Sequence, residues 1–284
     1  MTTKAGPHII AVEDLSRPDL EPYRDQKDAW LRVQRDGGTG LGGLFIAEGE
    51  IVARELFASK FVVRSVLVTP TRLLSMQDAI EALPNGTPVY VAERTVAEQI
   101  VGFDMHRGVL ALGDRGARPS LEAVVSGARC VLLLEGLSNH DNVGSLYRSL
   151  SALGPADAAV VLGPGCADPF YRKSLRVSMG HVLRIPTAWV DAWPADLGVL
   201  ERAGFRTVAL TPDPRAIPLS DAGLRCPPDR IALMLGAEGP GLTQAAMAAA
   251  DLRVRIPMNE GVDSLNVGVS AAIALAGLCT PGRG

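Results

Sequence analysis

Short apolar runs alternate with helix-like segments along most of the chain, and this alternation constrains the fold more than any other feature. Residues 130–134 are apolar at every position, which is typical of a strand buried on both faces of a parallel sheet. In the helix predicted to follow at 144–153, Leu146, Leu150 and Leu153 fall on one face. Further strands are predicted at 158–162, 182–185, 207–210, 231–235 and 252–256, and a helix of small residues at 266–278. The pattern predicts a parallel α/β domain.

The first part of the chain repeats the alternation. Strands are predicted at 44–47, 62–68, 89–91 and 108–112, helices at 23–35, 48–59, 76–83 and 95–101, and a glycine-rich loop at 37–43. Residues 114–119 are charged, contain glycine and end in proline, so they are the best candidate linker. We therefore predict two domains, a smaller α/β domain at residues 1–115 and a larger one at 116–284. The Pro-rich stretch at 194–228 is interpreted as a surface excursion.

Composition and charge exclude several classes of protein. The formal net charge of −3 argues mildly against a general nucleic-acid binder, so any basic surface is expected to gather near a cleft and on the first domain. No apolar run reaches the roughly 18 residues that a membrane-spanning helix needs, and the N-terminus has no signal-peptide pattern. The four cysteines form no CxxC pair, so neither a metal site nor a disulfide framework is expected. A cytoplasmic protein is predicted.

Three segments at predicted strand ends carry the polar candidates. In the first, Asn142 is placed to cap a helix, and Arg148 lies further along the same helix, directed toward the crevice at the carboxyl ends of the strands. In the second, Glu238 stands in a glycine-rich turn after a strand. In the third, Ser264 and Asn266 are candidate helix caps. Taken singly, Asn142 is better explained as an ordinary cap and Arg148 as a solvated charge, and the glycine-rich turn is explained at least as well as an ordinary tight turn.

Taken together, the order and content of the three segments resemble the SpoU/TrmH family of RNA ribose methyltransferases, within the trefoil-knotted SPOUT class. The resemblance covers about residues 128–276. It rests on residues 142–144 with Arg148, 235–239 with Gly241, and 256–258 with 264–267. In the first part of the chain, residues 44–49, 65–70 and 106–111 resemble the small substrate-binding domain that many members carry, which is similar to a ribosomal-protein-like RNA binder.

The resemblance implies binding of S-adenosylmethionine in a deep knot at about residues 231–276, methyl transfer to an RNA ribose 2′-hydroxyl, a homodimer, and no metal. The implied cofactor contacts are Leu235, Gly236, Ile256, Met258 and Leu265. The implied catalytic residues are Arg148, Asn142, Glu238, Ser264 and Asn266. Because an arginine stays protonated, Arg148 is expected to clamp an RNA phosphate and the ribose hydroxyl. Asn142 would hold Arg148 or the ribose, and Glu238 would pair with Arg148.

The sequence leaves two other functions open. One is a catalytically inactive RNA-binding relative with the same fold. The other is a nucleotide-dependent oxidoreductase. The glycines of residues 236–241 argue against it, because their spacing is G-x-x-G-x-G and the dinucleotide-binding fingerprint is G-x-G-x-x-G. Both rRNA and tRNA are candidate substrates, with rRNA slightly favoured by the resemblance of the first domain.

Overall fold

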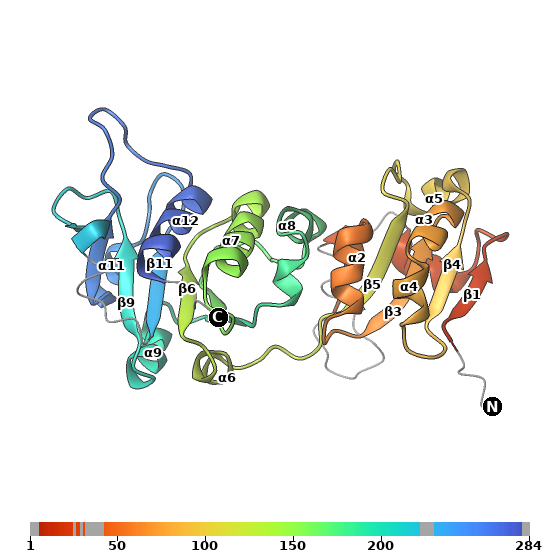
Figure 1. Ribbon diagram of the computed structural model, residues 1–284, viewed down its shortest axis with the longest axis horizontal. Helices are drawn as coiled ribbons and strands as arrows, with labels where there is room; N and C mark the ends of the chain where they lie inside the picture. Colours follow the sequence, from red (N-terminus) through yellow and green to blue (C-terminus); the bar gives the residue numbers. More distant parts are fainter. Residues whose placement is uncertain (1–5, 25–26, 29–30, 32–42, 222–229, 280–284) are drawn as a thin grey trace. The chain divides into compact units, whose positions relative to one another are not determined.

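The computed structural model describes residues 6–24, 27–28, 31, 43–221 and 230–279. Contacts divide the chain into two compact units (Figure 1). The first unit comprises residues 1–117 and 170–184, and the second comprises 118–169 and 185–284. The sequence does not predict that residues 170–184 group with the first unit. The expected helix at 23–35 and the glycine-rich loop at 37–43 lie mostly outside the described residues.

The first unit is built on a mixed five-stranded sheet. Its strands are β1 His8–Ala11, β2 Leu44–Glu48, β3 Val63–Val68, β4 Pro88–Val91 and β5 Val109–Asp114. They lie in the order β1-β4-β3-β5-β2, with β1, β4 and β3 parallel and with β5 antiparallel to both β3 and β2. Its helices are η1 Pro18–Tyr23, α2 Glu50–Phe57, α3 Pro70–Ser75, α4 Gln77–Glu81, α5 Arg94–Val101, α8 Arg172–Val177 and η2 His181–Leu183.

Residues 170–184 join the first unit through aromatic and ionic contacts. The ring of Phe170 packs on the rings of Phe45 and Phe61, with centroid distances of 5.2 and 5.4 Å. Arg172 pairs with Asp28, Nε to Oδ1, at 3.1 Å. The strand expected at 182–185 is wrong, because the chain turns there at Gly180, where φ is 83°, and forms the short helix η2.

The second unit is built on a sheet whose strand pairs are all parallel. Its strands are β6 Cys130–Leu134, β7 Ala159–Leu162, β8 Thr187–Trp189, β9 Arg206–Leu210, β10 Ile217–Pro218, β11 Ile231–Leu235 and β12 Leu252–Arg255. The order is β10-β12-β9-β11-β6-β7-β8. Its helices are α6 Leu121–Ser126, α7 His140–Leu153, η3 Ala195–Leu197, α9 Gly198–Arg202, α11 Gln244–Ala249 and α12 Val267–Leu278. The predicted parallel α/β fold is therefore confirmed.

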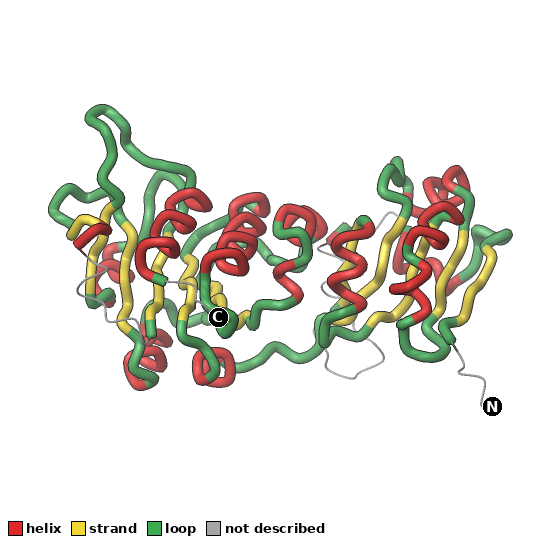
Figure 2. The backbone as a smooth tube through the Cα atoms, viewed as in Figure 1, coloured by secondary structure: helices red, strands yellow, loops and turns green. Residues whose placement is uncertain are grey.

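Helices cover this sheet on both faces (Figure 2). Residues of α6, α9 and α11 form one hydrophobic core with alternate residues of the central strands, such as Leu133 and Met234. Helices α7 and α12 pack on each other, and α12 also contacts β11. All five residues of β6 are buried, as the apolar run predicted.

Two details differ from the sequence expectations. Helix α7 begins at His140, and its cap is Asn139, whose side chain accepts a hydrogen bond from the backbone N–H of Asp141 at 2.8 Å. Asn142 is therefore not the cap but lies buried in the first turn. The stretch at 194–228 is no surface excursion, because it supplies β9 between β12 and β11 as well as the fully buried Leu200 of α9.

Two of the four cysteines, Cys130 and Cys279, lie together in the second unit, with their sulfur atoms 3.3 Å apart as free thiols. Among the described residues, no helix is long and apolar enough to cross a membrane. In the same part of the chain, no group of three or more histidine, cysteine or acidic side chains could hold a metal ion.

Candidate functional site

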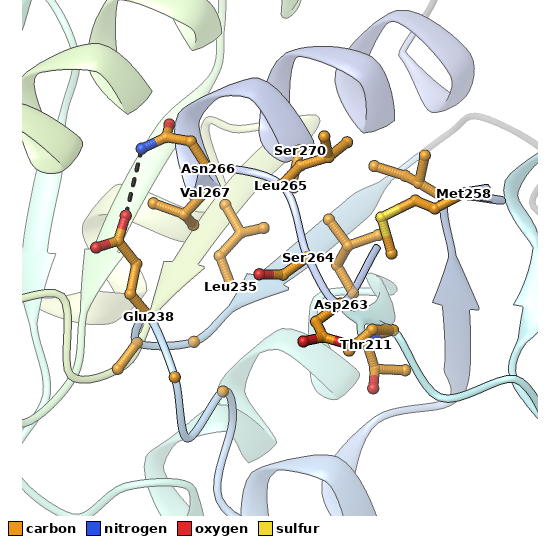
Figure 3. A pocket seen from close by; sticks show the side chains of 17 residues that line it. Thr211, Leu235, Glu238, Met258, Asp263, Ser264, Leu265, Asn266, Val267 and Ser270 are labelled. Atoms are coloured by element: carbon orange, nitrogen blue, oxygen red, sulfur yellow. Dashed lines mark hydrogen bonds between the residues drawn. The ribbon is translucent and has the colours of Figure 1, made fainter. Parts of the chain in front are cut away.

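A pocket of about 480 Å³ opens at the carboxyl ends of β9, β11 and β12. These ends share one edge because the strands are parallel, and this edge is where open α/β sheets bind ligands. Figure 3 shows side chains from the three strand-end loops around one space. All five residues implied as cofactor contacts line it: Leu235, Gly236, Ile256, Met258 and Leu265.

The turn after β11 folds back tightly on its own start. The backbone N–H of Gly241 donates to the carbonyl of Ala237 at 3.0 Å. A Cβ atom on Gly236 would overlap the backbone of Gly241 and Leu242, far inside the 3.0 Å limit that real Cβ atoms respect. Residue 236 must therefore be glycine for the turn to form the pocket wall.

Three side chains from three different segments meet beside the pocket. The amide nitrogen of Asn142 donates to Oε1 of Glu238 at 2.8 Å. The amide nitrogen of Asn266 donates to Oδ1 of Asn142 at 3.0 Å and is 3.3 Å from the same oxygen of Glu238 (Figure 3). Asn266 also caps α12, because its Oδ1 accepts from the backbone N–H of Gly268 at 2.9 Å. These bonds fix the Glu238 carboxylate relative to α7 and α12.

Arg148 lies apart from this network. It comes six residues after Asn142 on α7, which turns it roughly 120° around the helix axis, and its side chain is exposed. Within the described chain, Arg148 forms no ion pair with Glu238, whose partners are the two asparagines. The expected pairing of Glu238 with Arg148 is therefore wrong. Ser264 lines the pocket but does not cap a helix.

Sequence reasoning missed some polar groups of this region. Thr211 and Asp263 line the pocket. Glu135, directly after β6, is buried and accepts hydrogen bonds from the backbone N–H and the hydroxyl of Thr243, each at 2.8 Å. Because Thr243 caps α11, Glu135 fixes the far end of the glycine-rich turn. A charged residue ending a fully apolar strand is the signal that would have identified Glu135.

The residues that build this site lie in a segment that matches a known protein family. Residues 129–276 match the model of the SpoU rRNA Methylase family. The chain belongs to this family. The matched residues include β6, α7, β11, β12 and most of α12, and so they contain all ten candidate site residues.

Relatives span nearly the whole chain. A Mycobacterium tuberculosis protein described as an uncharacterized tRNA/rRNA methyltransferase is 43% identical over 94% of this chain and 92% of its own length. The Bacillus subtilis 23S rRNA (guanosine(2553)-2′-O)-methyltransferase RlmP is 29% identical over 89% of this chain and 96% of its own. The crystal structure of an AdoMet-bound rRNA methyltransferase from Sinorhizobium meliloti has the same fold, with a TM-score of 0.74, 20% identity and coverage of 95% and 97%. Each of these matches extends over residues of both units.

Proposed function

We propose that this protein transfers the methyl group of S-adenosylmethionine to the 2′-hydroxyl of a ribose in RNA. The observation that carries the proposal is the pocket at the strand ends, which brings together all five implied cofactor contacts beside the Asn142–Glu238–Asn266 network. The Bacillus subtilis relative named above, a 23S rRNA 2′-O-methyltransferase, favours rRNA over tRNA as the substrate. Action on rRNA also favours the cytoplasm as the site of action.

The pocket suits the proposed cofactor by shape and chemistry. Its volume lies within the range of small-molecule sites. Leu235, Ile256, Met258 and Leu265 provide apolar walls, while the turn around Gly236 exposes backbone groups for hydrogen bonding. We further propose the trefoil knot that the family resemblance implies for about residues 231–276.

Catalysis by these residues consists of positioning and of help with a proton. The bound cofactor supplies a methyl group that is already a good electrophile, whereas a ribose hydroxyl is hardly ionised at neutral pH. The exposed guanidinium of Arg148 forms no ion pair with Glu238 among the described residues, so it can hold an RNA phosphate and the hydroxyl oxygen. Asn142, Glu238 and Asn266 keep α7, which carries Arg148, in register with the pocket.

A transfer assay tests the proposed reaction. The protein is mixed with methyl-labelled S-adenosylmethionine and with rRNA or tRNA that lacks the modification, and the RNA is digested to nucleosides. We expect label on a ribose oxygen, found as one 2′-O-methylated nucleoside. Cofactor binding without transfer to any RNA would instead identify an inactive RNA-binding relative. A tight complex with NAD would support the alternative function as an oxidoreductase.

A homodimer is proposed from the exposed apolar face that lies on and next to α12. Leu265, Val269 and Ile273 follow one another at four-residue spacing, and their exposed fractions are 37, 49 and 38%. Apolar side chains at this spacing form one stripe on a helix, and such a stripe marks an interaction surface. Because Leu265 also lines the pocket, a second copy seated on this stripe would lie next to the cofactor site.

The double substitution Val269→Glu, Ile273→Glu should convert the protein to a monomer. Because each side chain is less than half exposed, burying the remainder contributes roughly 1 kcal/mol; a symmetric dimer buries each side chain twice, and carboxylates in their place oppose association further. We therefore expect dimer affinity to fall at least about 100-fold, measured by light scattering after gel filtration. Ile51→Glu on α2, at a residue 54% exposed, is the matched control and should remain dimeric. A dimer that withstands the double substitution contradicts this interface.

A further inference from the structure

The charge of the pocket is one-sided. Two carboxylates, Glu238 and Asp263, line it, and no lysine, arginine or histidine is found among the described residues of its lining. A ligand that fills this space therefore meets negative side chains without a positive partner. Such an environment favours a ligand that carries positive charge.

The two carboxylates differ in their partners. Oε1 of Glu238 already accepts from the amides of Asn142 and Asn266. Asp263 lies in the loop between β12 and α12, and in the described part of the chain no salt bridge joins it to a cation. Figure 3 shows its carboxylate on the side of the pocket that Thr211 lines, away from Asn266. Asp263 is thus the carboxylate of the two that the asparagine network does not hold.

The proposed reaction changes the charge of the ligand, and the inference rests on that proposed function. S-adenosylmethionine carries a sulfonium, an ammonium and a carboxylate, and so has a net charge of +1 at neutral pH. In the transfer, a carbon–oxygen bond to the ribose forms, the carbon–sulfur bond breaks, and its electron pair stays on sulfur. The hydroxyl proton leaves to solvent. The product S-adenosylhomocysteine therefore has a net charge of zero.

We propose that Asp263 is a specificity-determining residue, which makes the pocket prefer the cationic cofactor to its uncharged demethylated product. The carboxylate attracts the sulfonium before transfer and loses that attraction once the methyl group has left. Exchange of product for new cofactor is thereby favoured without any movement of the chain. Because Asp263 is exposed, solvent and salt screen the effect, and the preference should weaken as ionic strength rises.

Binding of three ligands to the full-length protein tests the proposal. The ligands are S-adenosylmethionine, S-adenosylhomocysteine, and an analogue in which a carbon bearing a protonated amine replaces the sulfonium. Titration calorimetry gives the affinity of each for the unaltered protein, Asp263→Asn, Asp263→Glu and Glu260→Gln. Glu260 is the matched control, since it is an exposed acid of the same loop that does not line the pocket.

We expect Asp263→Asn to lower the preference for both cationic ligands over S-adenosylhomocysteine about fivefold, which corresponds to roughly 1 kcal/mol. The affinity for S-adenosylhomocysteine itself should stay within about twofold. Asp263→Glu, which keeps the charge, should retain most of the preference, and Glu260→Gln should retain all of it. In 0.5 M salt the difference between the unaltered protein and Asp263→Asn should shrink.

Other outcomes overturn the proposal in distinguishable ways. If Asp263→Asn lowers the affinity for all three ligands equally, or changes none of the affinities, the carboxylate does not distinguish ligands by their charge, although the pocket still binds the cofactor. If the unaltered protein binds none of the three, the proposed methyltransferase function fails and the inference fails with it. Since Asp263 lies in an exposed loop, circular dichroism should show unchanged folding of the Asp263→Asn variant.

Discussion

Replacing Gly236 with alanine should lower the affinity for S-adenosylmethionine at least about 100-fold while the rest of the second unit stays folded. The added Cβ atom would overlap the backbone of Gly241 and Leu242, not the movable end of a side chain. The turn after β11 must then shift by an appreciable part of an ångström, so that several contacts between the pocket wall and the cofactor weaken together; a combined loss of about 2.7 kcal/mol corresponds to 100-fold in affinity. Titration calorimetry measures the affinity, and circular dichroism measures the folding.

The matched control is Gly127→Ala, at the end of α6. Its φ is −89°, and a Cβ atom there would meet nothing within 4 Å. Glycine to alanine at this residue should leave the affinity for the cofactor unchanged, because it alters neither the backbone conformation nor the pocket. Near-normal cofactor binding by Gly236→Ala would show that the turn can move to accommodate a Cβ atom. The close approach of Gly236 to Gly241 and Leu242 would then not be required for the pocket.

The sequence predicts some elements of this fold accurately and others poorly. The bounds of β6 and β11 agree with prediction residue for residue, because each is an uninterrupted apolar run of five residues, a length that suits a buried strand and is too short for a helix. Residues 182–185 are a weaker pattern, because Arg184 interrupts the apolar residues, and so short a segment suits a strand and a turn equally well. Gly180, just before them, decides for the turn.

Helix α7 begins four residues before the predicted start at Gly144, and the reason is also local. Asn139 and Asn142 are both good helix caps, and the periodicity of the leucines that follow does not distinguish between them. The choice has a functional consequence. Because Asn139 takes the cap, the amide of Asn142 is available to bind Glu238, 96 residues further along the chain.

The candidate site was predictable as a region but not as a set of contacts. Parallel strands place their carboxyl ends at one edge, so the loops after β11 and β12 had to lie close together. Which side chains touch depends on distances that a linear pattern does not contain. The sequence pairs Glu238 with Arg148, whereas the structure pairs it with two asparagines. Thr211 reaches the pocket because β9 lies between β12 and β11 in the sheet, and this strand order cannot be read from the sequence.

Arg148→Ala should separate catalysis from cofactor binding. Arg148 is exposed and does not line the pocket, so its removal should leave the affinity for S-adenosylmethionine within about twofold. Methyl transfer should fall at least about 100-fold, since groups that hold the reacting atoms and assist proton transfer contribute roughly 10²–10⁴-fold. Single-turnover transfer to saturating RNA measures the chemical step, and titration calorimetry measures the cofactor affinity.

Two further variants decide what Arg148 does. Arg148→Lys keeps the charge but loses the planar fork that binds a phosphate through two hydrogen bonds, so a clamp predicts activity between that of the unaltered protein and that of the alanine variant. Arg202→Ala removes an exposed arginine of α9 in the same unit and should keep full activity. Full transfer by Arg148→Ala would exclude this residue from the mechanism. If the lysine variant is as inactive as the alanine variant, two-point binding of the phosphate, and not charge alone, carries the effect, because charge is the property that lysine retains.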